Sequence, residues 1–401
     1  MKKVVYLFLF SMIFTNAFAL SAFITPAFAL SFILILHFFF QKGKKVFERP
    51  PYLLLFWLLL TFSLVVMSNG EKSLNHWFLW TFPFFSYYFV FKNELIQLFT
   101  LSEIKDKIFK YITFATLFAC SFSVLEFSCI NFLGADLSFI PRGAVEEYTP
   151  FDFGFFRARS FAEESGHFSF FIEIFGPISI FWISNNLKFP LKIIALTIIL
   201  LGLIATMSGV GLLLLVVYLF MLFNFYLIRK KGSTTIKLKV FFYAIGLFLL
   251  VFVLYPDAFS TIWDVIALKM DSDNTSYSDR AGRLTAIDKL SGFAYLIGYG
   301  PAAFSTLKID SFLSLYLGIL MNTGIIGISL FSLFCLSKYR SIRRISDIDC
   351  SFALKCSLIF ACFHLAFIDI IYVPWFWVLL SLIDVVYIKQ NKIDNLVYYD
   401  S

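Results

Sequence analysis

The sequence predicts an all-α polytopic membrane protein in which residues 1–401 form a single membrane domain. Of its residues, 60% are hydrophobic and only 15% are charged, whereas about 25% of the residues of a typical soluble domain are charged. The apolar residues also occur in long runs. A run such as VGLLLLVVYLF is apolar on every face, which favours membrane helices over the alternating strands of a membrane barrel.

The apolar runs predict about twelve transmembrane helices. A helix needs roughly 20 apolar residues to cross a hydrocarbon core about 30 Å thick. The runs that approach this length lie near residues 4–22, 24–40, 51–67, 76–91, 108–133, 168–186, 190–207, 209–228, 240–255, 311–336, 351–368 and 371–388.

The distribution of Lys and Arg predicts the orientation of these helices. Positively charged segments are retained on the cytoplasmic side of a membrane. When both termini are placed inside, the inner segments hold 24 of the 33 Lys and Arg residues. This asymmetry also accounts for the net charge of +7 without a nucleic-acid partner, which would need a soluble basic surface.

The cysteines and histidines do not indicate a cofactor. All six cysteines fall in or beside predicted membrane helices, and the four histidines are scattered along the chain. These positions predict neither a disulfide framework nor a set of metal ligands. We therefore expect no metal and no other cofactor.

Two outer segments, residues 134–167 and 256–310, are longer than the other connections. Long connections in a compact protein are usually functional or disordered. These two contain charged, amphipathic stretches rather than low-complexity sequence. We expect the functional residues to lie there.

The first outer segment ends in FFRARSFAEESGHFSF, residues 155–170. Ser160 and Glu163 have the spacing of a capping box, which predicts that the next membrane helix begins at Ser160. The start of a helix offers free N–H groups and partial positive charge to an anion. Arg157 and Arg159 stand just before it, and we predict that they bind a phosphate or pyrophosphate group.

Three further polar side chains follow the arginines. Arg159, Glu163 and His167 recur every four residues and share a helical face, while Glu164 lies three residues before His167. Because Glu163 fits the cap, Glu164 is the first candidate for the proton acceptor, with His167 orienting it. An ordinary ion pair, a simple cap and an interfacial histidine are the alternatives. Glu173 belongs either to the site or to a structural hydrogen bond between helices.

The second outer segment contains Arg280 and Arg283, which fall near one face of a short predicted helix. A solvated basic helix is the simpler alternative. The sequence from Ile297 to Pro301, IGYGP, predicts a tight turn. Together the two segments offer four arginines to a lipid-linked anion, because Arg binds phosphoryl oxygens in a bidentate manner.

The order of these motifs resembles that of the O-antigen and capsule polymerases called Wzy, within the wider O-antigen polymerase and ligase superfamily. R-x-R-S-F-x-E-E-S enters a helix, and T-x-S-G follows at Thr206 to Gly209. An outer loop with R-x-x-R and G-Y-G-P then precedes N-T-G-I-I-G at Asn322 to Gly327. The resemblance spans roughly residues 155–330.

The resemblance implies a glycosyltransferase of lipopolysaccharide or capsule biosynthesis that uses no nucleotide sugar. Such polymerases move a growing glycan from undecaprenyl pyrophosphate to a lipid-linked repeat unit, on the periplasmic face of the bacterial inner membrane. By position, Arg157 and Arg159 match the arginines of the family's first loop, and Arg280 and Arg283 those of its second. The expected partners are the lipid-linked oligosaccharide, membrane lipid and a chain-length regulator protein.

Two other functions remain open. The second outer segment has no histidine, which favours a polymerase over the related ligases that transfer glycan to the lipid A core. The R-x10-G spacing of some polymerases is absent. A flippase for the same lipid-linked units would need intramembrane charges along a path through both leaflets, rather than charges in two outer loops.

Overall fold

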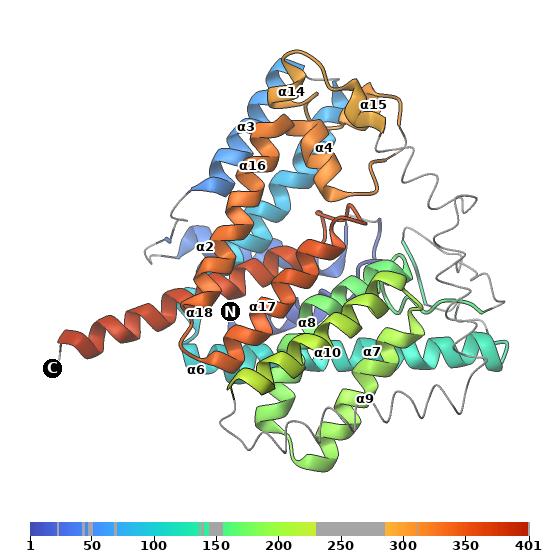
Figure 1. Ribbon diagram of the computed structural model, residues 1–401, viewed down its shortest axis with the longest axis vertical. Coiled ribbons are helices and arrows are strands. Elements are labelled where there is room, and N and C mark those ends of the chain that lie inside the picture. Colours follow the sequence, from blue (N-terminus) through green and yellow to red (C-terminus); the bar gives the residue numbers. More distant parts are fainter. Residues whose placement is uncertain are drawn as a thin grey trace.

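The computed structural model describes residues 1–21, 24–41, 45–46, 51–67, 70–135, 137, 140–143, 155–229, 285–309 and 311–399, with the backbone alone at 226–229 and 392–399. Its elements are helices, which confirms the all-α prediction (Figure 1). In chain order they are α1 (Lys2–Ser11), α2 (Pro26–Phe40), α3 (Tyr52–Met67), α4 (Glu71–Pro83), the π-helix η1 (Phe84–Val90), α5 (Phe91–Leu98), α6 (Leu101–Glu103), the π-helix η2 (Ile104–Ile108), α7 (Phe109–Phe132), α8 (Ser165–Asn186), α9 (Phe189–Ala205), α10 (Gly209–Arg229), the 3-10 helix η3 (Thr285–Lys289), α14 (Ala294–Ile297), α15 (Ala303–Thr306), α16 (Leu315–Arg343), α17 (Ile348–His364) and α18 (Pro374–Tyr399).

The length and composition of the helices indicate a membrane protein. Three helical stretches are long and apolar enough to cross a membrane, namely Leu101–Phe132, Ser165–Asn186 and Leu315–Arg343. Four apolar helices of 10–17 residues accompany them: Pro26–Phe40, Tyr52–Met67, Phe189–Ala205 and Gly209–Phe225. The predicted count of about twelve transmembrane helices is therefore not reproduced in the described parts of the chain.

The largest local difference concerns the first predicted span. Helix α1 ends at Ser11 instead of continuing to residue 22. The backbone N–H groups of Asn16 and Ala17 both donate to the Phe161 carbonyl, at 2.9 and 3.2 Å. This pairing with a distant segment replaces the intrahelical hydrogen bonds that a longer α1 would make. The predicted span at 240–255 lies outside the described residues.

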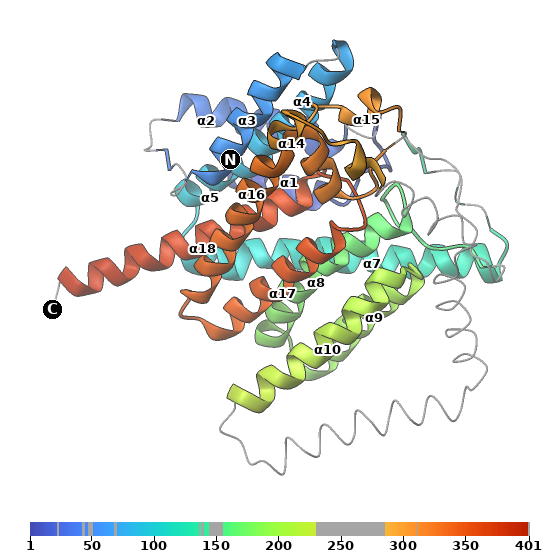
Figure 2. The same ribbon diagram turned by 45° about the horizontal axis from the view of Figure 1, so that its top comes forward.

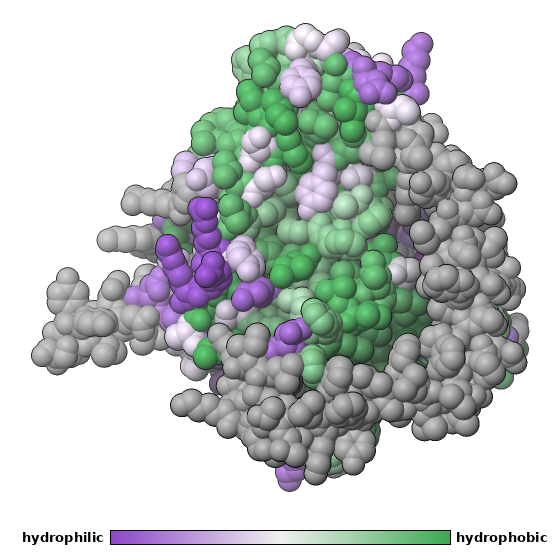
Figure 3. All heavy atoms as spheres, viewed as in Figure 1, coloured by the Kyte–Doolittle hydropathy of each residue, from purple (hydrophilic) through white to green (hydrophobic). Residues whose placement is uncertain are grey.

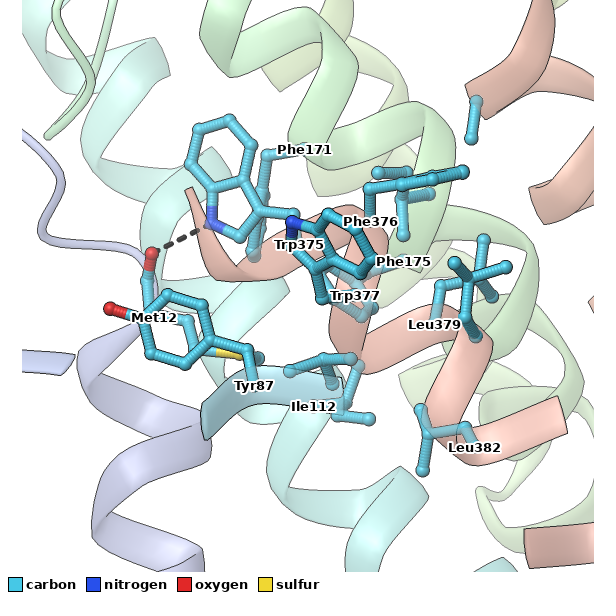
Figure 4. Packing of buried hydrophobic residues seen from close by; sticks show 14 of the residues in the cluster. Met12, Tyr87, Ile112, Phe171, Phe175, Trp375, Phe376, Trp377, Leu379 and Leu382 are labelled. Carbon is cyan, nitrogen blue, oxygen red and sulfur yellow. Dashed lines mark hydrogen bonds between the residues drawn. The ribbon is translucent and has the colours of Figure 1, made fainter. Parts of the chain in front are cut away.

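Helix α8 lies at the centre of the packing, in contact with α7, α9, α10, α17 and α18 (Figures 1 and 2). In its most apolar 18-residue window, 78% of the residues are buried inside the protein. Trp375 of α18 packs against Phe171 of α8, with 5.3 Å between ring centroids. Its indole N–H donates to the Met12 carbonyl at 2.7 Å (Figure 4). The start of α8 is thereby fixed relative to the chain after α1.

The G-Y-G-P turn packs against the N-T-G-I-I-G motif, which lies within α16. Gly324 has a φ of +65° and interrupts the helix, and a Cβ atom there would lie 2.3 Å from the Leu296 carbonyl carbon. The N–H groups of Tyr299 and Gly300 donate to the carbonyls of Met321 and Asn322, at 2.8 and 3.1 Å. Only a glycine at position 324 allows the backbone at Leu296 to approach α16 so closely. The predicted tight turn thus packs on the bend in α16.

The face drawn in Figure 3 carries a broad, continuous area of apolar side chains, with hydrophilic groups gathered at its margins. Many large apolar side chains are exposed on the helices that are long enough to cross a membrane and on the neighbouring helices. Among them are Phe114, Phe118, Leu125, Leu213 and Val216. Monomeric soluble proteins rarely expose apolar areas of this extent. A hydrocarbon environment is the setting that such a surface fits.

Candidate functional site

A buried carboxylate of α7 fixes the turn that carries Arg157 and Arg159. Glu126 Oε2 accepts hydrogen bonds from the backbone N–H groups of Arg159 and Ser160, at 2.8 and 2.6 Å. Glu126 Oε1 lies 2.9 Å from Nη2 of Arg142, whose Nη1 donates to the Ser160 carbonyl at 3.2 Å. Glu126 is fully buried. Residues 156–165, which we call the arginine turn, are thus anchored by an ion pair inside the protein.

Further contacts fix the arginine turn at both sides. The Asn131 side chain donates to the Phe156 carbonyl at 2.9 Å and accepts from the Phe156 N–H at 2.7 Å. The Ala158 N–H donates to the Ala205 carbonyl, at the end of α9, at 3.0 Å. Helices α7 and α9 therefore hold the backbone of the turn independently of α8.

The predicted capping box is wrong. Ser160 has a φ of +52°, and its hydroxyl donates to the Ala119 carbonyl at 2.9 Å. Helix α8 begins at Ser165, with Glu164 as an N-cap that makes no side-chain capping bond. The Ser160 hydroxyl is buried against α7, where the Ala119 carbonyl is the acceptor within reach. Glu163 is therefore not occupied as a cap, and the reason for preferring Glu164 as proton acceptor no longer holds.

The two arginines of the turn differ in exposure. Arg157 is partly exposed, and its Nε donates to the Thr206 carbonyl at 3.2 Å, which joins the R-x-R-S motif to the T-x-S-G motif. Arg159 is only 3% exposed, and its Nη1 donates to the backbone carbonyl of Glu163 at 3.1 Å. Arg157 is thus the arginine that an outside anion can reach, while Arg159 holds the backbone beneath Glu163.

Glu163 faces Tyr372, which lies between α17 and α18. The Tyr372 hydroxyl donates to Glu163 Oε2 at 3.0 Å, and His167 Nδ1 lies 3.5 Å from the same oxygen. Glu163 Oε1 is buried and makes no hydrogen bond within the described residues. Burial raises the pKa of Glu163 to about 7, against the lowering effect of the Tyr372 hydrogen bond. A carboxyl group with such a pKa can accept and release a proton near neutral pH.

Tyr372, which contacts Glu163, was not among the predicted site residues. Neither was Asp369, which lies in the same connection as Tyr372 and acts on it electrostatically. Burial raises the pKa of Asp369 to about 7 and also raises that of Tyr372. The only feature of the sequence that could have marked these two residues as part of the site was their position in the short outer connection between the last two predicted spans. Glu164, by contrast, is exposed at the start of α8.

Glu173 has a structural hydrogen bond, one of the two alternatives that its sequence position allowed. Its Oε2 lies 2.5 Å from Nδ1 of His364 on α17, and its Oε1 accepts from the Ser169 hydroxyl at 2.9 Å. Glu173 and His364 are almost completely buried. The pair therefore joins α8 to α17, which places Tyr372, eight residues beyond His364, near the start of α8.

The second outer segment is described only from residue 285 onward. Arg280 and Arg283 lie outside the described residues. Asp288 and Lys289 of η3 are exposed. Within the described parts of the chain, no three or more His, Cys, Asp or Glu side chains are grouped so as to hold a metal ion.

Comparison with known proteins assigns no family to this arrangement. No family model matches the sequence, and no curated protein matches it.

Proposed function

We propose that the protein is a glycosyltransferase that polymerises oligosaccharide units linked to undecaprenyl pyrophosphate. The observation that supports this most directly is the arginine turn. It presents a partly exposed arginine and a largely buried carboxyl with a pKa near neutrality within one segment that α7 and α9 anchor. A transfer from a pyrophosphate carrier needs both groups, because charge develops on the leaving group while the attacking hydroxyl loses its proton.

The proposed reaction is a displacement at the anomeric carbon of the donor glycan. A hydroxyl of the acceptor repeat unit attacks this carbon, and the bond between the carbon and the pyrophosphate oxygen breaks. Glu163 takes the hydroxyl proton, and undecaprenyl pyrophosphate leaves with the bonding electron pair. Arg157 stabilises the leaving pyrophosphate, and Arg280 and Arg283 of the second outer segment are the further proposed ligands.

Glu163 is favoured over Glu164 as the proton acceptor. A proton acceptor works best when its pKa lies near the working pH, and burial gives Glu163 such a pKa. Its buried Oε1 makes no hydrogen bond within the described residues. His167 and Tyr372, which both approach Oε2, are proposed to orient the carboxylate and leave Oε1 for the substrate.

The proposed location is the bacterial inner membrane, with the arginine turn at the periplasmic face. The asymmetry of Lys and Arg along the sequence supports this orientation. A chain-length regulator protein is the proposed protein partner, and membrane lipid surrounds the helices. The exposed apolar side chains on the described helices are consistent with contact with lipid.

Deletion of the gene followed by analysis of surface polysaccharide tests the proposal. A polymerase mutant retains a single repeat unit on its acceptor. A ligase mutant transfers no glycan to the lipid A core, and a flippase mutant accumulates lipid-linked units in the cytoplasm. We expect single units, and either of the other two patterns would assign the protein to the corresponding alternative.

A further inference from the structure

We infer that residues 285–309, at the end of the second outer segment, dock on the outer leaflet of the bilayer through the exposed apolar side chains of α14. We call these residues the outer unit. The inference does not depend on the proposed function. It rests on how the outer unit is attached to α3 and α16, on where those helices end, and on which side chains of α14 are exposed.

The outer unit is attached to α16 and α3 at two glycines. Gly298 has a φ of +74°, and a Cβ atom there would lie 2.3 Å from the Asn322 carbonyl carbon of α16. A Cβ atom at Gly300 would lie 3.2 Å from the Cβ atom of Met67, the last residue of α3. The Ala303 N–H donates to Asn322 Oδ1 at 3.1 Å. Because its backbone contacts both helices, the outer unit has a fixed position at their ends.

Both helices place this attachment near the outer boundary of the hydrocarbon. The last turn of α16 contains Arg340 and Arg343, which belong on the cytoplasmic side. Gly324 lies about 28 Å before Arg343 at helical rise, and the hydrocarbon core is about 30 Å thick. Helix α3 follows the basic stretch at 42–49 and ends at Met67. The outer unit therefore lies at the level of the outer lipid headgroups.

Helix α14 directs its large apolar side chains away from the protein. Ala294 and Ile297 are buried, whereas Phe293, Tyr295 and Leu296 are 54, 53 and 45% exposed. Aromatic residues are enriched at the boundary between membrane and water, where a Tyr ring contacts apolar groups while its hydroxyl remains hydrated. The exposed side chains of α14 thus have the composition of an interfacial anchor.

The exposed side of α14 adjoins the apolar surface of the membrane helices. The Leu296 backbone lies against Gly324, and Ile325, the next residue of α16, is exposed. Val65 and Val66, near the end of α3, are exposed as well. In Figure 3, apolar side chains continue from the middle of the molecule to its upper end, where Figure 1 shows α14. This continuity favours lipid as the occupant, because the same hydrocarbon would cover the whole surface.

Charged side chains lie on both sides of α14 in the outer unit. Asp288 and Lys289 of η3 are exposed, and so is Lys308, which follows α15. Lys289 Nζ donates to the Leu307 carbonyl at 3.4 Å, which joins the two flanking parts. The outer unit therefore combines an apolar helix with charged flanks, as segments that lie in the membrane interface do.

Collisions of a nitroxide label with O2 and with a water-soluble nickel chelate test the inference, because O2 concentrates in hydrocarbon and the chelate in water. In the full-length chain, the partly exposed Cys129, Cys335 and Cys362 are replaced by Ala. One labelled cysteine is then introduced by Tyr295→Cys or by Ser291→Cys, and the protein is placed in phosphatidylcholine nanodiscs. We expect the ratio of O2 to nickel collision rates to exceed one at position 295. It should fall below one at position 291, an exposed polar position four residues earlier.

Two further labels make the result independent of any single variant. Phe293→Cys should match Tyr295→Cys and replaces it if that variant does not fold. Val65→Cys, at an exposed position of α3, is the reference for contact with lipid. A ratio below one at both 293 and 295 would place α14 in water. Low collision rates with both reagents would mean that protein covers α14, from a second copy or from elsewhere in the chain. Either result contradicts the inference, and neither bears on polymerase activity.

Discussion

The Tyr372 hydroxyl donates a hydrogen bond to the Glu163 carboxylate at 3.0 Å, across a sequence separation of 209 residues. The contact joins the arginine turn to the connection between α17 and α18. It leaves one carboxylate oxygen of Glu163 buried without a hydrogen bond among the described residues. The proposed chemistry of the protein depends on this carboxyl group.

Replacing Glu163 should separate its role from that of its neighbour. We expect Glu163→Gln to reduce polymerisation at least 100-fold, because an amide cannot accept the proton, and general base catalysis contributes about 10²- to 10⁴-fold. Glu164→Gln, the matched control one residue away and exposed, should retain most of the activity. Both variants should reach the membrane in normal amounts. Loss of activity in Glu164→Gln with Glu163→Gln active would exchange the two roles.

Removing the Tyr372 hydroxyl should shift the pH dependence of the activity. The hydrogen bond from Tyr372 lowers the pKa of Glu163, against the larger raising effect of burial. Glu163 must be ionised to accept a proton, so activity should rise with pH through a pKa of about 7. Tyr372→Phe should move this rise to higher pH. A pH profile of initial rates for the two proteins measures the shift, and an unchanged profile would remove Tyr372 from the site.

The same pKa predicts how Glu163 affects stability. Its pKa is raised from 4.5 to about 7 in the folded protein, so between these values the folded state binds more protons than the unfolded state. The contribution of Glu163 to stability is therefore present at low pH and is lost as pH rises through about 7. In detergent, the difference in melting temperature between Glu163→Gln and the unmodified protein should grow in favour of the variant from pH 5 to pH 8. A constant difference would mean that Glu163 has an ordinary pKa.

The Glu126 and Arg142 pair should be essential for the arginine turn. Removing one partner of a buried ion pair typically destabilises a protein by about 3–5 kcal/mol, because the other charge remains buried without compensation. We expect Glu126→Gln to lower the melting temperature strongly. The double variant with Arg142→Gln should be less destabilised than the sum of the two single variants. Additive effects would show that the 2.9 Å contact does not couple the two residues.

Much of the helical framework was predictable from the sequence, because long apolar runs are a local signal. The run at 168–186 corresponds to α8, Ser165–Asn186, and the run at 190–207 to α9, Phe189–Ala205. The prediction of a first span at residues 4–22 failed because the backbone of Asn16 and Ala17 pairs with Phe161. This contact crosses more than a hundred positions, and no local sequence pattern reveals it.

The candidate site shows the same division between local and distant contacts. Glu163 and His167 lie 3.5 Å apart, but Glu163 precedes α8, which begins at Ser165, so the predicted helical spacing does not explain this contact. The capping box failed because Ser160 bonds to the Ala119 carbonyl of another helix. Glu126 was visible only as a lone carboxylate within an apolar run, and its partner Arg142 follows on a separate segment.

Reconstitution of the purified protein with its proposed substrate tests the central claim most directly. The protein is placed in lipid vesicles with an undecaprenyl-pyrophosphate-linked oligosaccharide repeat unit from its own host, and the products are separated by length. We predict a ladder of glycans that grows by whole repeat units and releases undecaprenyl pyrophosphate, and that is absent with Glu163→Gln. Transfer of single units to added lipid A core without a ladder, or an unchanged substrate in the presence of folded protein, would contradict the proposed polymerase activity.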